Sequence, residues 1–343
     1  MPVPVEKVTE LGPGETTRRI NYLVRDGYWD VVERRFAGFL GAIVTTWGAT
    51  PAETSSVQTR YHNGALPARA LRGKVLTEQV RDGTGRRLSL TTNTWNTMVV
   101  AGLPDVPLLR RAILKEARTR HEDTTPIRET RASHEYDGFG RLARTIDQGR
   151  LDLTGDESTR ETRHADDDTT WVRDRLCEEK VLSAEDGVVS HVQHLFGDEN
   201  QVHPLCVVGK GWERETRGWL EDPAGARFVT NTATRFDAHG NPIVVVEKGV
   251  TRTLSYDDSG LFVTGERLQV DAGELAWTME WDQVLGLPIS VRDPNGHESV
   301  ASYDSLGRLV GLAVDDRAPH LVVQYDWTAP IPKTTQWSFD GTF

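Results

Sequence analysis

Short runs that alternate apolar and polar residues fill most of the chain, and turn-forming residues interrupt them about every 8–12 residues. An apolar period of 3.6 residues, the mark of an amphipathic helix, hardly anywhere persists for three turns. Successive side chains of a strand point to opposite faces, so alternation with a period of two favours strands. The pattern therefore predicts an all-β chain built from antiparallel hairpins.

Short sequences rich in glycine and asparagine mark where the hairpins should turn, because these residues tolerate positive φ. They are Asp26-Gly27, Asn63-Gly64, Asp82-Gly83, Asp137-Gly138, Asp186-Gly187 and Pro294-Asn295-Gly296. Residues 108–118 stay open between helix and strand: their helix propensity is good, but Pro104 and Pro107 precede them and alternation resumes at residue 119. Residues 1–15 are rich in proline and glycine, which is typical of a linker or of an arbitrary start.

An aromatic residue followed directly by aspartate recurs along the chain, which indicates internal repeats. The pairs are Tyr136-Asp137, Phe236-Asp237, Tyr256-Asp257, Trp281-Asp282, Tyr303-Asp304 and Tyr325-Asp326. From residue 236 their spacings are 20, 25, 22 and 22 residues. A glycine follows three residues after the aspartate at Gly140, Gly240, Gly260 and Gly307, and four residues after it at Gly286.

This spacing has a physical meaning as a turn. The carboxylate can accept hydrogen bonds from the backbone N–H groups two and three residues on, and the glycine supplies the left-handed conformation that ends the turn. The aromatic residue is then the last of its strand, where it covers its counterpart in the next unit. One hairpin cannot bury its own face, so units of roughly 22 residues must pair edge to edge into a continuous sheet. We expect these positions to be structural, because catalysis needs one constellation and not one per repeat.

At these residues the chain resembles the Rhs/YD-repeat family, whose units read Tyr-Asp-x-x-Gly-Arg-Leu. Residues 136–142 and 303–309 match that unit fully. A second signature, residues 26–39, is similar to a segment in the middle region of the B components of bacterial insecticidal toxin complexes. Arg35 replaces the glutamate of that segment and Ala37 replaces its arginine. The stretch 71–76 continues the similarity.

The resemblance implies a curved or spiral sheet of hairpins that forms part of a hollow shell. Residues 16–130 would be the β-rich middle region of a toxin-complex B component, and residues 131–343 a YD-repeat array. That array looks truncated, because residues 339–343 resemble a unit cut within its turn. The implied partners are a toxin-complex C component, or further YD repeats of the same chain, and an enclosed toxin polypeptide. The implied location is extracellular, after assembly in the cytoplasm.

Composition narrows the classes of partner. The chain carries 51 acidic and 40 basic side chains, a formal net charge of -11, which argues against nucleic acid as a partner. No apolar run approaches the length of a membrane span, and the first residues lack the features of a secretory signal, so we expect no direct membrane insertion. Cys177 and Cys206 are too few for a disulfide framework, and one optional pair should matter little to a large core.

Candidate chemistry is sparse. His191, His194, His203 and Cys206 are zinc-ligand types, but residues three apart on a strand point to opposite faces, so we expect surface histidines. The acidic clusters at 152–157 and 164–168 lack the spacing of a calcium loop. Walker, dinucleotide-binding and nucleophile-elbow motifs are missing from the sequence. We therefore expect no metal, no cofactor and no enzymatic activity.

The sequence predicts a structural segment of a YD-repeat shell that encapsulates a toxin polypeptide and helps to deliver it. The alternative is a cell-surface adhesion or carbohydrate-binding module built from the same repeats. Ten tryptophans would supply a stacking platform for sugars, although Trp281 occupies an aromatic repeat position and favours packing. A glycoside hydrolase would need two carboxylates that converge in one cleft, which sequence does not show.

Overall fold

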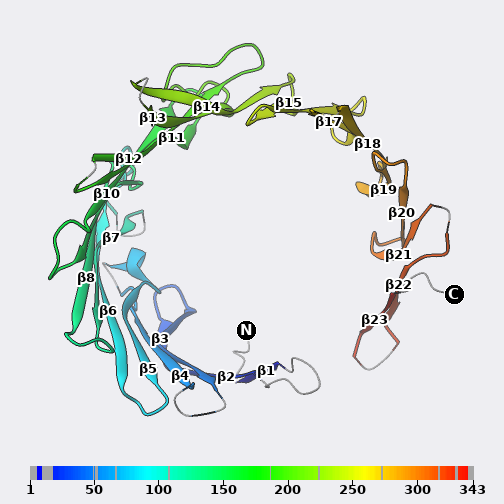
Figure 1. Cartoon of the computed structure of the whole chain (residues 1–343). Helices are drawn as coiled ribbons and strands as arrows, with labels where there is room; N and C mark the ends of the chain where they lie inside the picture. Colours follow the sequence, from blue (N-terminus) through cyan, green and yellow to red (C-terminus); the bar gives the residue numbers. More distant parts are fainter. Residues whose placement is uncertain are drawn as a thin grey trace. The chain divides into compact units, whose positions relative to one another are not determined.

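The computed structural model describes residues 6–9, 18–48, 50, 53–65, 68–106, 109–185, 187–222, 225–271, 273–315, 317–328 and 331–338. These residues form β-strands that follow one another in chain order, and one short 3-10 turn, η1 (Figure 1). No α-helix occurs in the described ranges. The prediction of an all-β chain of antiparallel hairpins is confirmed.

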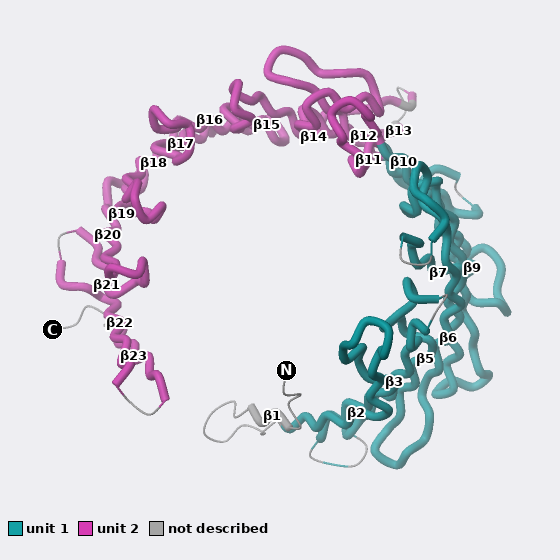
Figure 2. The backbone as a smooth tube through the Cα atoms, turned by 180° about the vertical axis from the view of Figure 1, so that it is seen from behind, with its two compact units in different colours: residues 1–164, 178–191 teal, residues 165–177, 192–343 magenta. Residues whose placement is uncertain are grey.

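The chain divides into two compact units (Figure 2): residues 1–164 with 178–191, and residues 165–177 with 192–343. Unit 1 contains β1 (Glu6–Thr9), β2 (Arg18–Asp30), β3 (Arg35–Trp47), β4 (Ser55–Tyr61), η1 (Arg69–Leu71), β5 (Val75–Asp82), β6 (Arg87–Met98), β7 (Arg111–His121), β8 (Arg128–Tyr136) and β9 (Leu142–Arg150). The division passes through β10 (Ser158–Asp167), β11 (Val172–Ser183) and β12 (Gly187–Gly197).

Unit 2 continues the same pattern. Its strands are β13 (Trp212–Asp222), β14 (Gly225–Phe236), β15 (Pro242–Glu247), β16 (Val250–Tyr256), β17 (Val263–Val270), β18 (Gly273–Asp282), β19 (Leu287–Arg292), β20 (Glu298–Tyr303), β21 (Leu309–Val314), β22 (Leu321–Asp326) and β23 (Lys333–Ser338). Within each unit, successive strands pair antiparallel.

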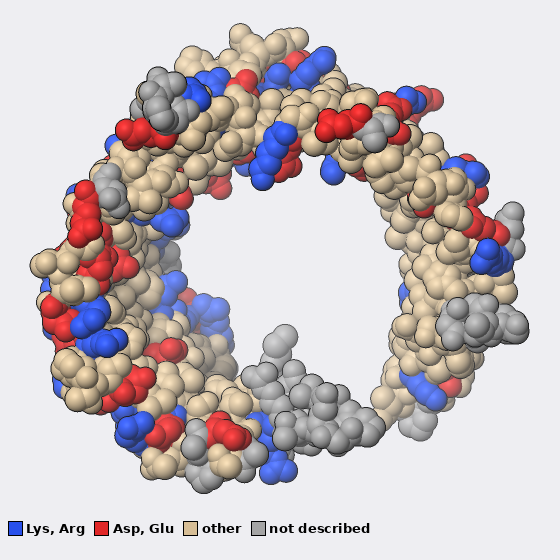
Figure 3. All heavy atoms as spheres, in the orientation of Figure 1, with Lys and Arg blue, Asp and Glu red and all other residues tan. Residues whose placement is uncertain are grey.

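Few side chains are fully buried, because most strands have no second layer against them. The buried apolar side chains in the described ranges are Leu71, Ile113, Ala165, Cys177, Leu195, Phe196 and Val208. Instead, charged side chains pair across neighbouring strands, as in Arg118–Glu129 at 2.5 Å and Arg252–Glu266 at 3.0 Å. Acidic and basic groups accordingly lie interspersed on the face seen in Figure 3. Exposed pairs of this kind contribute at most about 1 kcal/mol each, so the backbone ladders and half-buried side chains carry most of the stability.

The expected large core is not found in the described ranges, and the cysteine pair that the sequence leaves optional is formed. Cys177 and Cys206 form a disulfide, and Cys177 is fully buried. The disulfide lies in a cluster with Ala165, Phe196 and Val208, within unit 2. It ties β11 to the connection between β12 and β13, where the buried residues Ala165, Phe196 and Val208 gather.

Two further expectations need correction or completion. Asp26-Gly27 is not a hairpin turn: β2 runs through it, and its pairing with β3 stays in register from Arg25↔Gly41 to Gly27↔Phe39 although Asp26 has a positive φ (54°). The register shifts between Gly27 and Trp29, where β3 carries the extra residue, and the chain reverses at residues 31–34. Residues 111–118, which were open between helix and strand, belong to β7. Pairing with β6 and β8 on both edges outweighs the helix propensity.

Some predicted features lie partly or wholly outside the described residues. In the proline-rich start, Glu6–Thr9 pair with β2, and the rest of residues 1–15 lies outside the described ranges. Leu108, Asp186 and the truncated unit at residues 339–343 also lie outside them.

Candidate functional site: repeat turns and strand-to-strand locks

The aspartate of each aromatic-Asp pair organises the turn that follows it. Asp137 Oδ1 accepts hydrogen bonds from the backbone N–H groups of Phe139 and Arg141, both at 2.9 Å. Asp237 and Asp304 accept from the same two relative positions. The second donor is thus four residues on, not three as the sequence argument expects. The reason is Gly140, whose positive φ (74°) turns the next N–H back toward the carboxylate.

The remaining turns are variants of this arrangement. Asp257 accepts from residues four and five positions on, and Asp282 from residues two and three positions on, ahead of the late Gly286. Asp326 accepts from the N–H of Thr328. Glycines at all five predicted positions have positive φ, namely Gly140, Gly240, Gly260, Gly286 and Gly307. The same turn also occurs at Asp82 and Asp293, where no aromatic residue precedes the aspartate.

These carboxylates are committed to their turns. A side-chain hydrogen bond from Arg308 and the backbone N–H groups of the turn hold the pKa of Asp304 below its ordinary value. At Asp237 the backbone N–H of Asn241 is the largest cause of the lowered pKa. A carboxylate that is ionised and fully hydrogen-bonded stabilises backbone geometry, and this is a structural use of charge.

The aromatic residue of every pair except the last sits at a β-bulge, since Tyr325 pairs with Thr334 without a register shift. The strand register shifts just before Tyr136, Phe236, Tyr256, Trp281 and Tyr303. A bulge re-aims the side chain that follows it. Four of these aromatic residues pair with the first residue of the next strand, which is Leu142, Pro242, Val263 or Leu309. Trp281 pairs with Pro288, the second residue of β19.

In unit 2 the aromatic side chains of the aromatic-Asp pairs connect successive repeats. Each donates a hydrogen bond to the carbonyl of the residue that pairs with the aromatic of the preceding repeat. The bonds are Tyr256 Oη to Pro242 O (3.1 Å), Trp281 Nε1 to Val263 O (2.6 Å), Tyr303 Oη to Pro288 O (2.9 Å) and Tyr325 Oη to Leu309 O (3.1 Å). We call this series the aromatic chain. Phe236 has no polar group and packs on Trp212, with ring centroids 5.5 Å apart.

Unit 1 contains the same kind of hydrogen bond at Tyr136, which belongs to the aromatic-Asp pattern, and at two positions that the pattern misses. Tyr136 Oη donates to the carbonyl of Leu114 at 3.0 Å. Trp95 Nε1 donates to Val75 O at 2.7 Å, and Thr162 Oγ1 donates to Leu142 O at 2.5 Å. Both of these last pairs are 20 residues apart. The repeat spacing was the available signal for Trp95, but no aspartate follows it to complete the motif.

The two segments that carry the resemblance to toxin-complex B components meet in unit 1. Asp30 and Glu33, from the turn after β2, form ion pairs with Arg69 and Arg72, from η1 and its end. Asp30 is 3% exposed, and its Oδ1 also accepts the N–H groups of Val32 and Glu33 at 3.0 Å. We call these four side chains the charged lock. Residues 26–39 and 71–76 are recognisable in the sequence, but their contact, and the part that Arg69 plays in it, are visible only in the structure.

The charged lock shifts the ionisation of its members in a consistent direction. The backbone N–H of Glu33 is the largest cause of the lowered pKa of Asp30, with Arg69 and Arg72 adding to it. The side-chain hydrogen bond from Arg72 lowers the pKa of Glu33, and the same bond raises the pKa of Arg72. Asp30, Glu33 and Arg72 are therefore charged at neutral pH, and ionised pairs hold the turn between β2 and β3.

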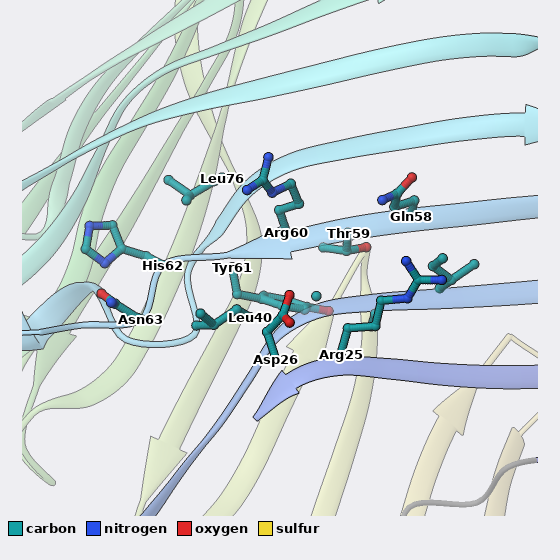
Figure 4. Close-up of a pocket in the computed structure, with 13 residues that line it drawn as sticks. Arg25, Asp26, Leu40, Gln58, Thr59, Arg60, Tyr61, His62, Asn63 and Leu76 are labelled. Atoms are coloured by element: carbon teal, nitrogen blue, oxygen red, sulfur yellow. The ribbon is translucent and has the colours of Figure 1, made fainter. Parts of the chain in front are cut away.

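A hollow of about 470 Å³ lies across the middle of the same β2–β3 hairpin and the neighbouring β4 (Figure 4). Arg25, Gly41 and Arg60 occupy matching register positions on β2, β3 and β4, and Gly41 leaves the space between the two arginines without a side chain. Asp26 and Tyr61 also line the hollow. The side chains of Arg25 and Arg60 make no hydrogen bond or ion pair with any residue in the described ranges, unlike the side chains of most strand arginines nearby.

The zinc-like residues do not converge. Cys206 is in the disulfide and is no thiolate. His191 faces Glu178, His194 faces Glu213 and His203 faces Asp198, at 2.8, 3.1 and 3.3 Å. The described residues contain no group of three metal-ligating side chains. They also contain no helix long and apolar enough to cross a membrane.

No family model matches the sequence, and no curated protein matches it. Solved structures do. The crystal structure of TcdB2-TccC3 matches over 94% of this chain with a TM-score of 0.66 at 12% sequence identity, and covers 25% of that chain. The crystal structure of TcdB2-TccC3-Cdc42 matches over 87% of the chain with a TM-score of 0.63, and the Photorhabdus luminescens Tc holotoxin pore over 94% with a TM-score of 0.63, each at 12% identity.

The chain spans a quarter or less of the length of the solved chains that it matches. At this level of identity the likeness is one of fold, and it agrees with the resemblance that the repeat residues indicate. The chain therefore has the antiparallel β-hairpin repeat fold found in toxin-complex structures.

Proposed function

We propose that this chain is a non-enzymatic wall segment of a β-repeat shell that encloses a polypeptide of the toxin-complex type and helps to deliver it. The observation that carries the proposal is the fold likeness to TcdB2-TccC3 along nearly the whole chain. The aromatic chain supports it, because each repeat is fastened to the one before by the same hydrogen bond. A wall needs many equivalent joints, whereas an active site needs one unique arrangement.

The proposal has a direct experiment. The native product is purified from producing cells with an antibody against this chain and treated with protease, with and without prior opening by denaturant. A shell predicts that peptides of an enclosed polypeptide survive protease in the intact sample and disappear in the opened one. If no polypeptide is protected in the intact sample, the shell role is wrong.

The alternative, a carbohydrate-binding module, is favoured by one observation. Trp171 and Trp327 are 78% and 62% exposed, and a flat indole face is the usual platform for a sugar ring. Guanidinium groups of Arg173 and Arg308 already lie over these rings at 5.2 Å from the centroids. A glycan-binding screen of the chain decides between the two: saturable binding that is lost in Trp171→Ala or Trp327→Ala supports the module.

A further inference from the structure

The turn between β2 and β3 exposes a group of large apolar side chains. Trp29, Val31, Val32 and Phe36 are 57%, 76%, 68% and 50% exposed. We call these four residues the β2–β3 tip. Contiguous apolar exposure of this kind is costly in water and usually marks a surface that contacts another molecule.

The β2–β3 tip is held rigid by polar neighbours. The charged lock fixes the turn from inside, with Asp30 nearly fully buried among its partners. Phe36 packs edge to face on Phe39, with ring centroids 5.1 Å apart. Ionic groups thus fix a turn whose apolar side chains face solvent. A rigid apolar surface loses little conformational entropy when it binds, which is the arrangement expected of a docking site.

The charges around the β2–β3 tip favour a partner with acidic groups. Arg34 is exposed in the same turn and pairs with no residue in the described ranges. Arg35, 62% exposed at its side chain, stands beside Phe36, but it pairs with Glu33 at 2.5 Å, so the free positive charge of the turn is that of Arg34. Farther along the same hairpin, the hollow presents the unpaired Arg25 and Arg60, offset by Asp26. This basic excess stands out in a chain whose net charge is -11.

We propose that the β2–β3 tip and the adjoining hollow bind an extended polypeptide segment that carries apolar and acidic side chains. The apolar side chains would cover Trp29 and Val32, and the carboxylates would reach the arginines, whose planar guanidinium groups suit them. The choice of a polypeptide rests on the proposed function, which supplies an enclosed chain. The choice of apolar and acidic side chains rests on the exposures and charges of the hairpin itself.

The test uses the full chain and a fluorescently labelled, disordered Gly/Ser peptide with spaced leucines and glutamates. Fluorescence anisotropy should show saturable binding that weakens at least about tenfold, or about 1.4 kcal/mol, in Trp29→Ser/Val32→Ser. The matched control is Val284→Ser, which replaces a 93% exposed valine in a unit 2 turn and should bind as the unaltered chain does. Changing the leucines of the peptide to serine should abolish binding, and changing its glutamates to lysine should weaken it.

Several results would overturn the inference. The first is that the tip variant binds the peptide as tightly as the unaltered chain does. The second is that the Val284→Ser control loses as much affinity as the tip variant. The third is that the affinity does not change when the leucines or the glutamates of the peptide are replaced. Light scattering could instead show a dimer that the tip variant does not form, and this would assign the surface to a second copy of the chain. If the unaltered chain sediments with phosphatidylserine vesicles and does not bind the peptide, and the tip variant does neither, the surface contacts a membrane. Circular dichroism checks that the variants fold. Because the assay reads the free chain, its result is independent of whether a protected polypeptide is found in the native product.

Discussion

The side chains of the charged lock have two effects on the turn between β2 and β3. Asp30 and Glu33 stabilise a turn through backbone N–H groups and two arginines, and they leave the apolar neighbours in between exposed. The signature at residues 26–39 was recognisable in the sequence, but its contact with Arg69 and Arg72 was not, because nothing in local spacing says which distant segment folds back onto a turn.

The charged lock makes unit 1 sensitive to acid. The pKa of Asp30 and that of Glu33 are lowered in the folded chain, so their ionised forms stabilise it. That stabilisation is complete above the ordinary carboxyl range near pH 4 and is lost as pH falls through the folded pKa values. We expect the denaturant midpoint of unit 1 to fall between pH 6 and pH 3, and to fall less in Asp30→Asn.

The matched control for this pH dependence is Asp26→Asn, because Asp26 makes no hydrogen bond or ion pair with a residue in the described ranges. Its acid sensitivity should equal that of the unaltered chain. If Asp30→Asn and Asp26→Asn show the same pH profile, the charged lock does not stabilise the turn as described.

The turn glycines are required for their backbone conformation. Gly307 has a φ of 73°, and a Cβ there would also lie 3.3 Å from Leu287 Cδ1. Gly307→Ala should therefore destabilise the chain by about 1–2 kcal/mol. Gly41→Ala is the control, because Gly41 has an ordinary φ and the nearest atom to its Cβ would be 3.7 Å away. Chemical denaturation measures both, and equal effects would contradict the turn geometry.

At the scale of elements, the strands and turns were predictable, but which strands pair with one another was predictable only in part. Alternation and Asp-x-x-Gly spacing mark β8, β9 and most hairpins of unit 2. They failed at Asp26-Gly27, where a turn-like pair lies within β2, because only the partner strand decides whether a positive φ reverses the chain. They left β7 undecided for a related reason, since its pairing edges lie in other segments.

The aromatic chain should be testable one hydrogen bond at a time. Tyr303→Phe removes the bond to the carbonyl of Pro288 and keeps the ring, so it should cost about 0.5–1.5 kcal/mol of unfolding free energy. Tyr28→Phe is the matched control, because the Tyr28 hydroxyl bonds to no residue in the described ranges, and it should change stability by less than about 0.5 kcal/mol. An equal cost for both variants would mean that the inter-repeat bond contributes nothing.

The disulfide is a covalent connection between two segments of unit 2. Cys177 and Cys206 are 29 residues apart, and closing a loop of that size stabilises a folded chain by about 3–4 kcal/mol. Reductant should therefore lower the denaturation midpoint of unit 2 in the unaltered chain. Cys177→Ser/Cys206→Ser should start at the lower value and not respond to reductant. A reductant effect of the same size in the variant would show that it does not act through this pair.

At the scale of the whole molecule, the all-β repeat fold was predictable because the same physical solution recurs and each copy repeats the signal. The disulfide cluster was not, because it is a single arrangement whose two cysteines lie far apart and belong to no repeat. Neither were the exposed β2–β3 tip and the hollow beside it, which depend on how one hairpin stands out from its neighbours. The structural role is therefore inferred from the features that recur in each repeat, and partner recognition is inferred from the β2–β3 tip and the hollow, which occur once in the described residues.

The central claim is that this chain is part of a wall around another polypeptide. Electron cryomicroscopy of the native assembly, isolated from producing cells through an antibody against this chain, tests it most directly. The account predicts strands β1–β23 in a single-layered β wall, with density for a separate polypeptide on its inner side. Particles in which these strands enclose no other polypeptide, or in which the chain stands alone as a free module, would contradict it.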